Sequence, residues 1–503
     1  MKNKALNLKL LMILTLLFSV NAVFGQQVAL GDFDEQGDIG NAAIKGSAVY
    51  NKAAQTYLLS GAGKSLNSQL HYLCKKIKGD FILNATVTFI GKSDKSEREA
   101  GIIATEQPDT SSRFVSGNVY DSIPIPASMQ FRKNKGEKID HLSISSYRSM
   151  ELSLERRGNI FSFSVAYYGE NYKTVSKNIE LDSNLFVGIY IRSATENKLE
   201  KAVFSNVRII IPAPNNFRPY IDYIGSHLEM MNVATGLRKI VYSLPGVSIQ
   251  APNWTRDNKQ LMYNVNGKIY TYELVNGKIV KLNTGTINNL DGDHVFSFDG
   301  KMLGISGPVG NRETIYIMPA NGSDNPSKIT TGETGPSYLH GWSPDKTTLV
   351  FTGKRNNIFD IYSINIATHK ETRLTENAVL DDGPEFTPDG KYIYFNSVRT
   401  GTMQIWRMKP DGSNQEQITF DEYNNWFPHI SPNGKWIVYL SFPKEIDPSD
   451  HPFYKNIYIK LMSASGGAPK TIAYVYGGQG TMNEPSWSPD SRNIAFISNS
   501  NFN

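Results

Sequence analysis

The stretch Trp342-Ser343-Pro344-Asp345-Lys346 decides the fold, because the same pattern recurs, with some drift, six times in the second half of the chain. The first position of each copy is an aromatic or apolar residue and the second is Ser or Thr. The third is most often Pro, the fourth is Asp or Asn, and the fifth is most often Gly or Lys. The copies begin at Trp254, Phe296, Trp342, Phe386, Ile430 and Trp487, between 42 and 57 residues apart. Because Pro presets φ and Asp and Gly tolerate turn conformations, each copy predicts a tight turn between two strands.

Strand-like segments follow each turn in a fixed order. An apolar run such as 348–351 comes first, and a second signature follows it in five of the units. This signature reads Lys268-Ile269-Tyr270, Thr314-Ile315-Tyr316, Asp360-Ile361-Tyr362, Gln404-Ile405-Trp406 and Asn456-Ile457-Tyr458. A fourth short strand ends the unit, and four strands in ~45 residues predict one blade of a β-propeller.

The two ends of this region set the number of blades. Residues 227–242 have the pattern of the last two strands of a blade, and residues 485–497 have that of the first two. Joined, they form one blade, which closes the ring and removes the exposed sheet edge. The sequence therefore predicts six blades over residues 221–503.

The first half of the chain predicts a separate β domain. Apolar and polar residues alternate in 81–90 and 161–168, as in strands with one buried face, and no sustained helical period occurs between 29 and 211. We expect a β-sandwich over 29–211. Three prolines follow in the segment 212–220, which predicts a linker, because proline cannot join a sheet ladder. The fold class is therefore all-β.

The N-terminus predicts export. Residues 1–25 have a basic start, an apolar run over 10–20 and an exit of small residues, which is typical of a cleaved secretory signal. An N-terminal membrane anchor is the alternative, although the apolar run is shorter than the ~20 residues that span a bilayer. We expect a periplasmic or secreted protein without a membrane span after cleavage.

Charge and cysteine content exclude several classes of protein. The formal net charge is +5, three of the lysines lie in the signal segment, and the remaining chain has no long Lys/Arg run, so a nucleic-acid partner is not expected. Cys74 is the single cysteine. An intrachain disulfide is therefore excluded, and we expect Cys74 to be a small buried hydrophobe.

These motifs resemble known families. Residues 222–500 are similar to the TolB-like, WD-repeat-like bacterial propellers, whose blades carry a Pro-x-Trp-Ser-Pro-Asp-Gly run. That resemblance implies a six-bladed propeller, while its members include periplasmic binding proteins, peptidase gating domains and polysaccharide lyases. Residues 29–211 resemble the concanavalin-like jelly rolls of lectins and glycan-processing proteins, on their strand pattern and the closing segment 203–209.

Residues that precede each turn should form rings at one end of the propeller channel, because the first strands of all blades run side by side around the axis. Two positions before the aromatic residue stand Pro252, His294, His340, Pro384, Pro428 and Pro485. One position before it stand Asn253, Val295, Gly341, Glu385, His429 and Ser486. Three of the eight histidines therefore fall within two positions of one another in the repeat frame.

Histidine and carboxylate on one rim suggest two kinds of chemistry. Imidazole with Asp or Glu oxygens suits a divalent metal such as Mn, Zn or Fe, and it equally suits acid/base work. Resemblance to the oligogalacturonate lyases, which are similar propellers, implies metal or base roles for His294, His340 and His429, with Gln479 as an amide ligand. The candidate catalytic set is His294, His340, His429, Asp382 and Glu385.

A binding role is the function that we favour at this point. The candidate ligand-binding set at the rim is Asn424, Asn425, Trp426, Gln479, Asn483 and Glu484, with Trp426 as an exposed platform for a sugar. The ligand would be a carbohydrate or an envelope protein. The alternatives are a metal-assisted lyase or glycoside-cleaving enzyme, and a scaffold with a plugged channel. We expect residues 444–452 to be a solvated hairpin tip.

Overall fold

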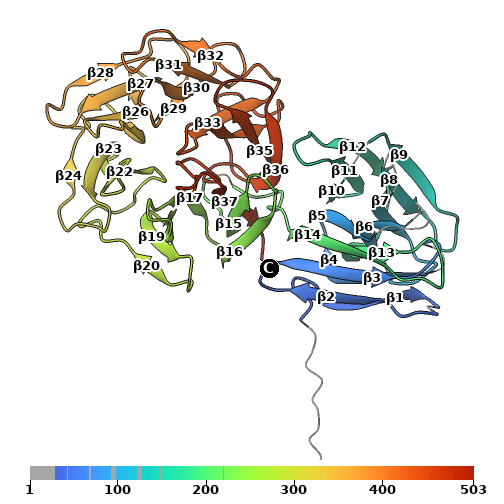
Figure 1. The fold of residues 1–503 in the computed structure, drawn as a ribbon. Helices are drawn as coiled ribbons and strands as arrows, with labels where there is room; N and C mark the ends of the chain where they lie inside the picture. Colours follow the sequence, from blue (N-terminus) through green and yellow to red (C-terminus); the bar gives the residue numbers. More distant parts are fainter. Residues whose placement is uncertain are drawn as a thin grey trace, which may run out of the picture.

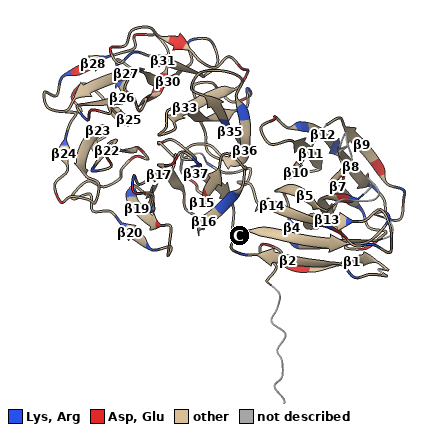
Figure 2. Ribbon diagram, in the orientation of Figure 1, with Lys and Arg blue, Asp and Glu red and all other residues tan. Residues whose placement is uncertain are grey.

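The computed structural model describes residues 29–502, apart from 42, 67–68, 92–97, 122–126, 147–149 and 219. The expected signal segment 1–25 lies outside the described residues. The described residues form strands and turns without an α-helix, so the prediction of an all-β fold is confirmed. None of these residues belongs to a helix that is long and apolar enough to cross a bilayer. Two parts lie side by side, the strands up to β14 in one and those from β15 onward in the other (Figure 1). Basic and acidic residues are interspersed over both parts (Figure 2).

The N-terminal part consists of two seven-stranded antiparallel sheets. The first sheet contains, in spatial order, β1 (Glu35–Gly40), β4 (Gln69–Lys78), β13 (Asn184–Arg192), β6 (Glu99–Thr105), β7 (Phe114–Tyr120), β8 (Ala127–Arg132) and β9 (Asp140–Ile144). The second contains β12 (Lys173–Asn178), β11 (Ile160–Ala166), β10 (Glu151–Arg157), β5 (Phe81–Ile90), β14 (Glu200–Ile210), β3 (Thr56–Gly61) and β2 (Ser47–Asn51).

Both sheets contribute side chains to one hydrophobic core. Alternate residues of β5 and β11, such as Leu83 and Phe163, are buried in it together with Val187 of β13 in the other sheet. The alternation of apolar and polar residues in the sequence therefore reflects strands that bury one face of each sheet in the shared core. Cys74 is buried, as expected. The likeness to concanavalin-like jelly rolls stays a prediction.

The C-terminal part is a propeller, and the prediction of six blades is confirmed. Five blades have four strands each, and the sixth joins the two ends of the region (Figure 1). The first two of these blades contain β17 (Ile249–Trp254), β18 (Gln260–Val265), β19 (Lys268–Glu273) and β20 (Ile279–Lys281), and then β21 (His294–Phe296), β22 (Met302–Val309), β23 (Arg312–Pro319) and β24 (Ser327–Lys328). The next two contain β25 (Ser337–Trp342), β26 (Thr348–Arg355), β27 (Ile358–Asn365) and β28 (Glu371–Arg373), and then β29 (Asp381–Phe386), β30 (Ile393–Ser397), β31 (Gln404–Met408) and β32 (Glu416–Gln417). The fifth contains β33 (Asn424–Ile430), β34 (Trp436–Phe442), β35 (Lys455–Ser463) and β36 (Lys470–Gly477). The sixth blade pairs β15 (Gly225–Asn232) with β16 (Arg238–Leu244) and with β37 (Asn493–Ser500).

The repeated turn is held by its own side chains. The Ser343 hydroxyl donates a hydrogen bond of 2.6 Å to the Asp345 carboxylate and accepts one of 3.0 Å from the backbone N–H of Thr348. The Asp345 carboxylate also accepts from the N–H of Thr347 at 3.1 Å. The same Ser/Thr-to-Asp/Asn bond occurs in the other five copies. The motif therefore recurs because it satisfies the backbone of the turn between the first and second strands.

Candidate functional site

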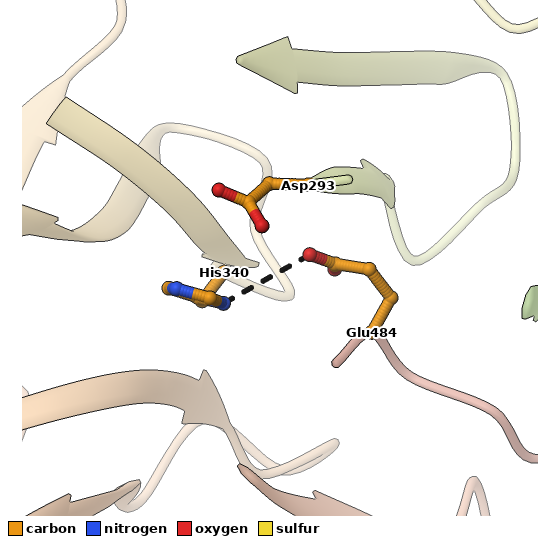
Figure 3. Close-up of side chains that lie close together, drawn as sticks. All are labelled: Asp293, His340 and Glu484. Carbon is orange, nitrogen blue, oxygen red and sulfur yellow. Dashed lines mark ion pairs between the residues drawn. The ribbon is translucent and has the colours of Figure 1, made fainter. Parts of the chain in front are cut away.

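The inner strands of the blades bring three titratable side chains together at one end of the channel. Asp293 directly precedes β21, His340 lies in β25, and Glu484 lies on the segment that leads into the sixth blade (Figure 3). One ligand atom of each lies within 4.8 Å of those of the other two. We call these three residues the axial cluster.

His340 bridges two carboxylates. Its Nε2 lies 3.4 Å from Asp382 Oδ1, and its Nδ1 lies 3.8 Å from Glu484 Oε1. Glu484 is fully buried, and neither of its carboxylate oxygens has a hydrogen-bond partner. A buried carboxyl group without partners is costly when ionised, so this site favours a proton or a cation on Glu484.

The pKa values of the cluster follow from burial and from the number of acidic groups. Burial raises the pKa of Glu484 well above its usual range, and repulsion from Asp293 and Glu385 adds to the effect. Burial likewise raises the pKa of Asp293, helped by Asp291 and Asp382. Burial also opposes ionisation of Asp382, but hydrogen bonds from His340 and Thr352 outweigh it and hold its pKa below the usual value.

A pocket of about 220 Å³ opens at this end of the channel and gives access to the cluster. Its charged and titratable lining is Asp291, Asp293, Asp382, His340 and His451, and no Lys or Arg is among the described residues that line it. Tyr338, Phe359 and Phe427 supply apolar surface. We call this pocket the acidic mouth. Its carboxylates favour a cationic ligand, and its aromatic rings favour one with an apolar or cationic group.

His451 was not among the sequence-based candidates. The segment 444–452 is exposed or half-exposed, as expected of a solvated tip, but its end turns inward. The His451 ring there lies edge-on to Trp426 and Phe427, with centroids 4.5 and 5.2 Å away. Burial lowers the pKa of His451. The signal in the sequence was the repeat spacing of 57 residues between Ile430 and Trp487, which marks an insertion in this blade.

Two of the three predicted metal-binding histidines are not in the axial cluster. His429 has both ring nitrogens in hydrogen bonds, Nδ1 with Glu385 at 2.7 Å and Nε2 with the Met482 carbonyl at 2.9 Å, so it has no free nitrogen for a metal. His294 is fully buried and donates from Nδ1 to the Gly292 carbonyl at 2.7 Å. Burial lowers its pKa to about 4. The expected set of three histidines is therefore wrong as a metal site, and only His340 lies with the carboxylates.

The predicted sugar platform is also wrong. Trp426 is fully buried in the core of its blade, because β33 turns its indole inward beneath His451. Asn424 and Asn425 are buried as well. Asn424 donates to the Ile446 carbonyl at 3.0 Å and Asn425 donates to Asp421 at 2.8 Å, so both hold loops rather than face a ligand.

The remaining candidates have mixed positions. Gln479 lines the acidic mouth, and its side-chain oxygen accepts from Asn483 at 3.1 Å. Asn483 in turn accepts from the N–H of Gly480 at 3.0 Å and so shapes the loop that carries Gln479. Glu385 is tied to His429 and to the N–H of Ile430, which makes it part of a buried network between neighbouring blades.

The opposite end of the channel is narrow. The cavity there has a volume of about 30 Å³ and is lined by the aromatic residues of the repeated turns, among them Trp254, Trp342 and Trp487, with Arg256 and Glu385.

Comparisons with known proteins agree with the propeller. Residues 333–447 match the family model described as the TolB beta propeller domain. An uncharacterized protein from Agrobacterium fabrum (strain C58) is 41% identical over 274 residues, which cover 54% of this chain and 92% of that protein. The solved structure of a TolB-type protein from Agrobacterium tumefaciens is similar with a TM-score of 0.53 and 40% identity, over 55% of this chain and 99% of that chain.

A more distant relative is the Tol-Pal system protein TolB of Francisella tularensis subsp. mediasiatica. It is 26% identical over 251 residues, which cover 48% of this chain. The match spans only 54% of that protein, about half of its length.

Proposed function

Because the chain belongs to the TolB-like β-propeller family, we propose that it is an exported envelope protein that binds a partner at the acidic mouth of its propeller channel. The observation that carries the proposal is the open pocket at this mouth, which is lined by the carboxylates of Asp291, Asp293 and Asp382. A relative whose name places it in the Tol-Pal system supports a role in an assembly of envelope proteins.

The charge of the mouth narrows the class of partner. Three aspartates and no lysine or arginine, among the described lining residues, favour a basic segment of a protein over an acidic saccharide. A lysine or arginine side chain in this pocket would meet the carboxylates of Asp291 and Asp382 and the rings of Tyr338 and Phe359. We therefore prefer the envelope-protein partner to the carbohydrate partner at this site.

Binding of short labelled Gly/Ser peptides tests this proposal. One peptide carries lysines, one carries glutamates and one has no charge, and their binding to the whole chain is followed by fluorescence anisotropy. We expect the lysine peptide to bind at least about tenfold more tightly than the others, with an affinity that falls as salt rises. Asp382→Asn should weaken it, whereas Glu333→Gln, at an exposed position outside the lining of the mouth, should not. Equal binding of all three peptides would contradict the proposal.

A second candidate function is metal-dependent chemistry on a saccharide, and the axial cluster is the observation that favours it. Asp293, His340 and Glu484 offer two oxygens and one nitrogen, a donor set that suits Mn or Zn. A bound cation would supply a Lewis acid at the base of the mouth. Elemental mass spectrometry of the purified protein after incubation with each ion tests this. Near-stoichiometric metal in the wild type that is lost in both His340→Ala and Glu484→Gln would support it, and no metal in the wild type would remove it.

A further inference from the structure

A second cavity lies between the two parts of the protein, away from the acidic mouth. It has a volume of about 270 Å³ and separates the outer face of the second sheet of the N-terminal part from β35 and β36 of the propeller. In Figure 1, β10–β12 lie on the side of the N-terminal part that is nearest to β35 and β36. We call this cavity the interdomain cleft.

The sheet wall of the interdomain cleft carries several small polar side chains, beside Ile82, Ile210 and Glu155. Ser162 and Ser164, on neighbouring outward positions of β11, line the cleft, and each shares a 2.8 Å hydrogen bond with a hydroxyl of β12. Asn84 of β5 also lines it, and its side-chain oxygen is buried without a hydrogen-bond partner. These groups leave donors and acceptors for a ligand with several hydroxyl groups.

The propeller wall carries Tyr423, Tyr458 and Tyr474, and Tyr172 of the N-terminal part meets them from the other side. Tyr474 stacks on Tyr172 with centroids 3.4 Å apart, and Tyr458 lies edge-on to Tyr474 at 5.3 Å. Tyr423 in turn meets Tyr458 edge-on at 5.3 Å. All four tyrosines line the cleft. Because each ring is fixed by the next, this wall is an aromatic surface in a defined orientation.

Direct bonds between the two parts fix the width of the cleft. The Thr471 hydroxyl donates to Asn171 at 2.6 Å, and the Tyr474 hydroxyl donates to the Glu170 carbonyl at 2.9 Å. At the other side, Asn456 donates to Glu155 at 3.2 Å. A ligand would therefore meet a cleft that is already formed, which lowers the entropic cost of binding.

We propose that the interdomain cleft binds a neutral saccharide, with one or two pyranose rings inside it. The half-exposed rings of Tyr423 and Tyr458 offer surface for the apolar face of a sugar ring. Hydroxyl and amide groups on the sheet wall offer bonds for its hydroxyls. Glu155 is the one charged side chain among the described lining residues. Its carboxylate would accept from a sugar hydroxyl, while its charge is balanced by Arg157 at 2.6 Å. The described lining residues include no Lys or Arg that would pair with a uronic acid, so the neutral class is favoured.

Saturation-transfer NMR and calorimetry on the whole chain test this proposal. The probes are glucose, galactose, mannose and N-acetylglucosamine, their β-linked disaccharides, and glucuronic and galacturonic acid. We expect at least one neutral probe to bind and the uronic acids to bind more weakly. Ser162→Arg, which places a long side chain in the cleft, should lower the affinity at least about tenfold.

Matched variants separate binding in the cleft from binding elsewhere. Tyr458→Leu removes one ring of the wall and should also lower the affinity about tenfold. Tyr316→Leu changes the same repeat position in a blade far from the N-terminal part, so it should bind as the wild type does. Absence of binding by every neutral probe, tighter binding of a uronic acid, or wild-type affinity in both cleft variants would overturn the proposal. Asp382→Asn should leave this binding unchanged, so failure here is independent of the acidic mouth.

Discussion

Glu484 is the side chain whose surroundings conflict most with its charge. It is fully buried, has no hydrogen-bond partner, and lies near Asp293 and Glu385, which also carry acidic groups. His340 Nδ1 lies 3.8 Å from one of its oxygens. Beyond that contact, either a proton held on the carboxyl group or a cation shared by the axial cluster would relieve the conflict. The two differ in how stability changes with pH and with divalent ions.

Glu484→Gln distinguishes them. The raised pKa means that the folded protein binds this proton more tightly than the unfolded chain does, so its contribution to stability is complete in acid and is lost as the pH rises through the raised pKa. The neutral amide avoids that loss. In EDTA we expect the variant to be more stable than the wild type by about 1–3 kcal/mol at pH 8 to 9 and nearly equal to it near pH 5.

Thermal unfolding across this pH range, with and without Mn or Zn, is the measurement. Glu333→Gln, an exposed site, serves as control and should follow the wild type. A variant that is less stable than the wild type at high pH in EDTA would contradict protonation of Glu484. A wild type that gains stability only when the ion is present would indicate the cation instead.

The repeated turn is the element that makes the propeller. Its fifth position has a positive φ in all six copies, from 61° at Asn258 and Ser491 to 70° at Gly300. Glycine adopts this conformation without strain, which explains the Asp-Gly pairs in the sequence. The turn is local, so its signal is complete in a few consecutive residues.

Gly434→Ala tests the backbone requirement in isolation. The added methyl group would meet no atom within 4 Å, so its effect comes from φ of 68° alone. We expect a loss of about 1–2 kcal/mol in the free energy of unfolding, measured by chemical denaturation. Gly292→Ala is the matched control, because its φ is not in the left-handed region and its new methyl group makes only contacts of 3.5 Å or longer. Equal losses in the two variants would show that the turn conformation is not the cause.

Local patterns account for what could be predicted from the sequence. The blades, their number and the strands of the first half follow from turns and alternation, and these were confirmed. The position of Trp426 could not be predicted, because a residue before the turn faces either the channel or the blade core according to the bulge between Trp426 and His429 in β33. His451 could not be predicted either, since an insertion carries no repeat frame that says where its tip folds. His340 was identified because it does lie in that frame.

The two halves of the molecule are joined by charges as well as by apolar contacts. Glu229 of β15 is fully buried between Arg208 of β14 and Arg238 of β16, at 2.8 and 2.7 Å. Burial works against ionisation of Glu229, but the two guanidinium groups outweigh it and hold its pKa well below the usual range. Because Arg208 belongs to the sandwich and Glu229 to the propeller, this triad couples the stability of one half to that of the other.

Glu229→Gln should uncouple them. The variant leaves two buried guanidinium groups without a counter-charge, which costs about 3–5 kcal/mol. We expect calorimetry to give one heat-absorption peak for the wild type and two for the variant, with the sandwich and the propeller unfolding apart. Asp222→Asn removes the exposed pair with Arg218 in the connecting segment and should change stability by less than about 1 kcal/mol.

Acid provides an independent check of the same triad. A lowered pKa in the folded state means that the contribution of Glu229 is complete above its unfolded pKa and is lost as the pH falls through the lowered value. The wild type should therefore begin to show two peaks below about pH 4, whereas Glu229→Gln shows two peaks at every pH. A single peak in the variant at neutral pH would mean that the apolar contacts around Tyr454 and Tyr476 are sufficient to hold the two halves together.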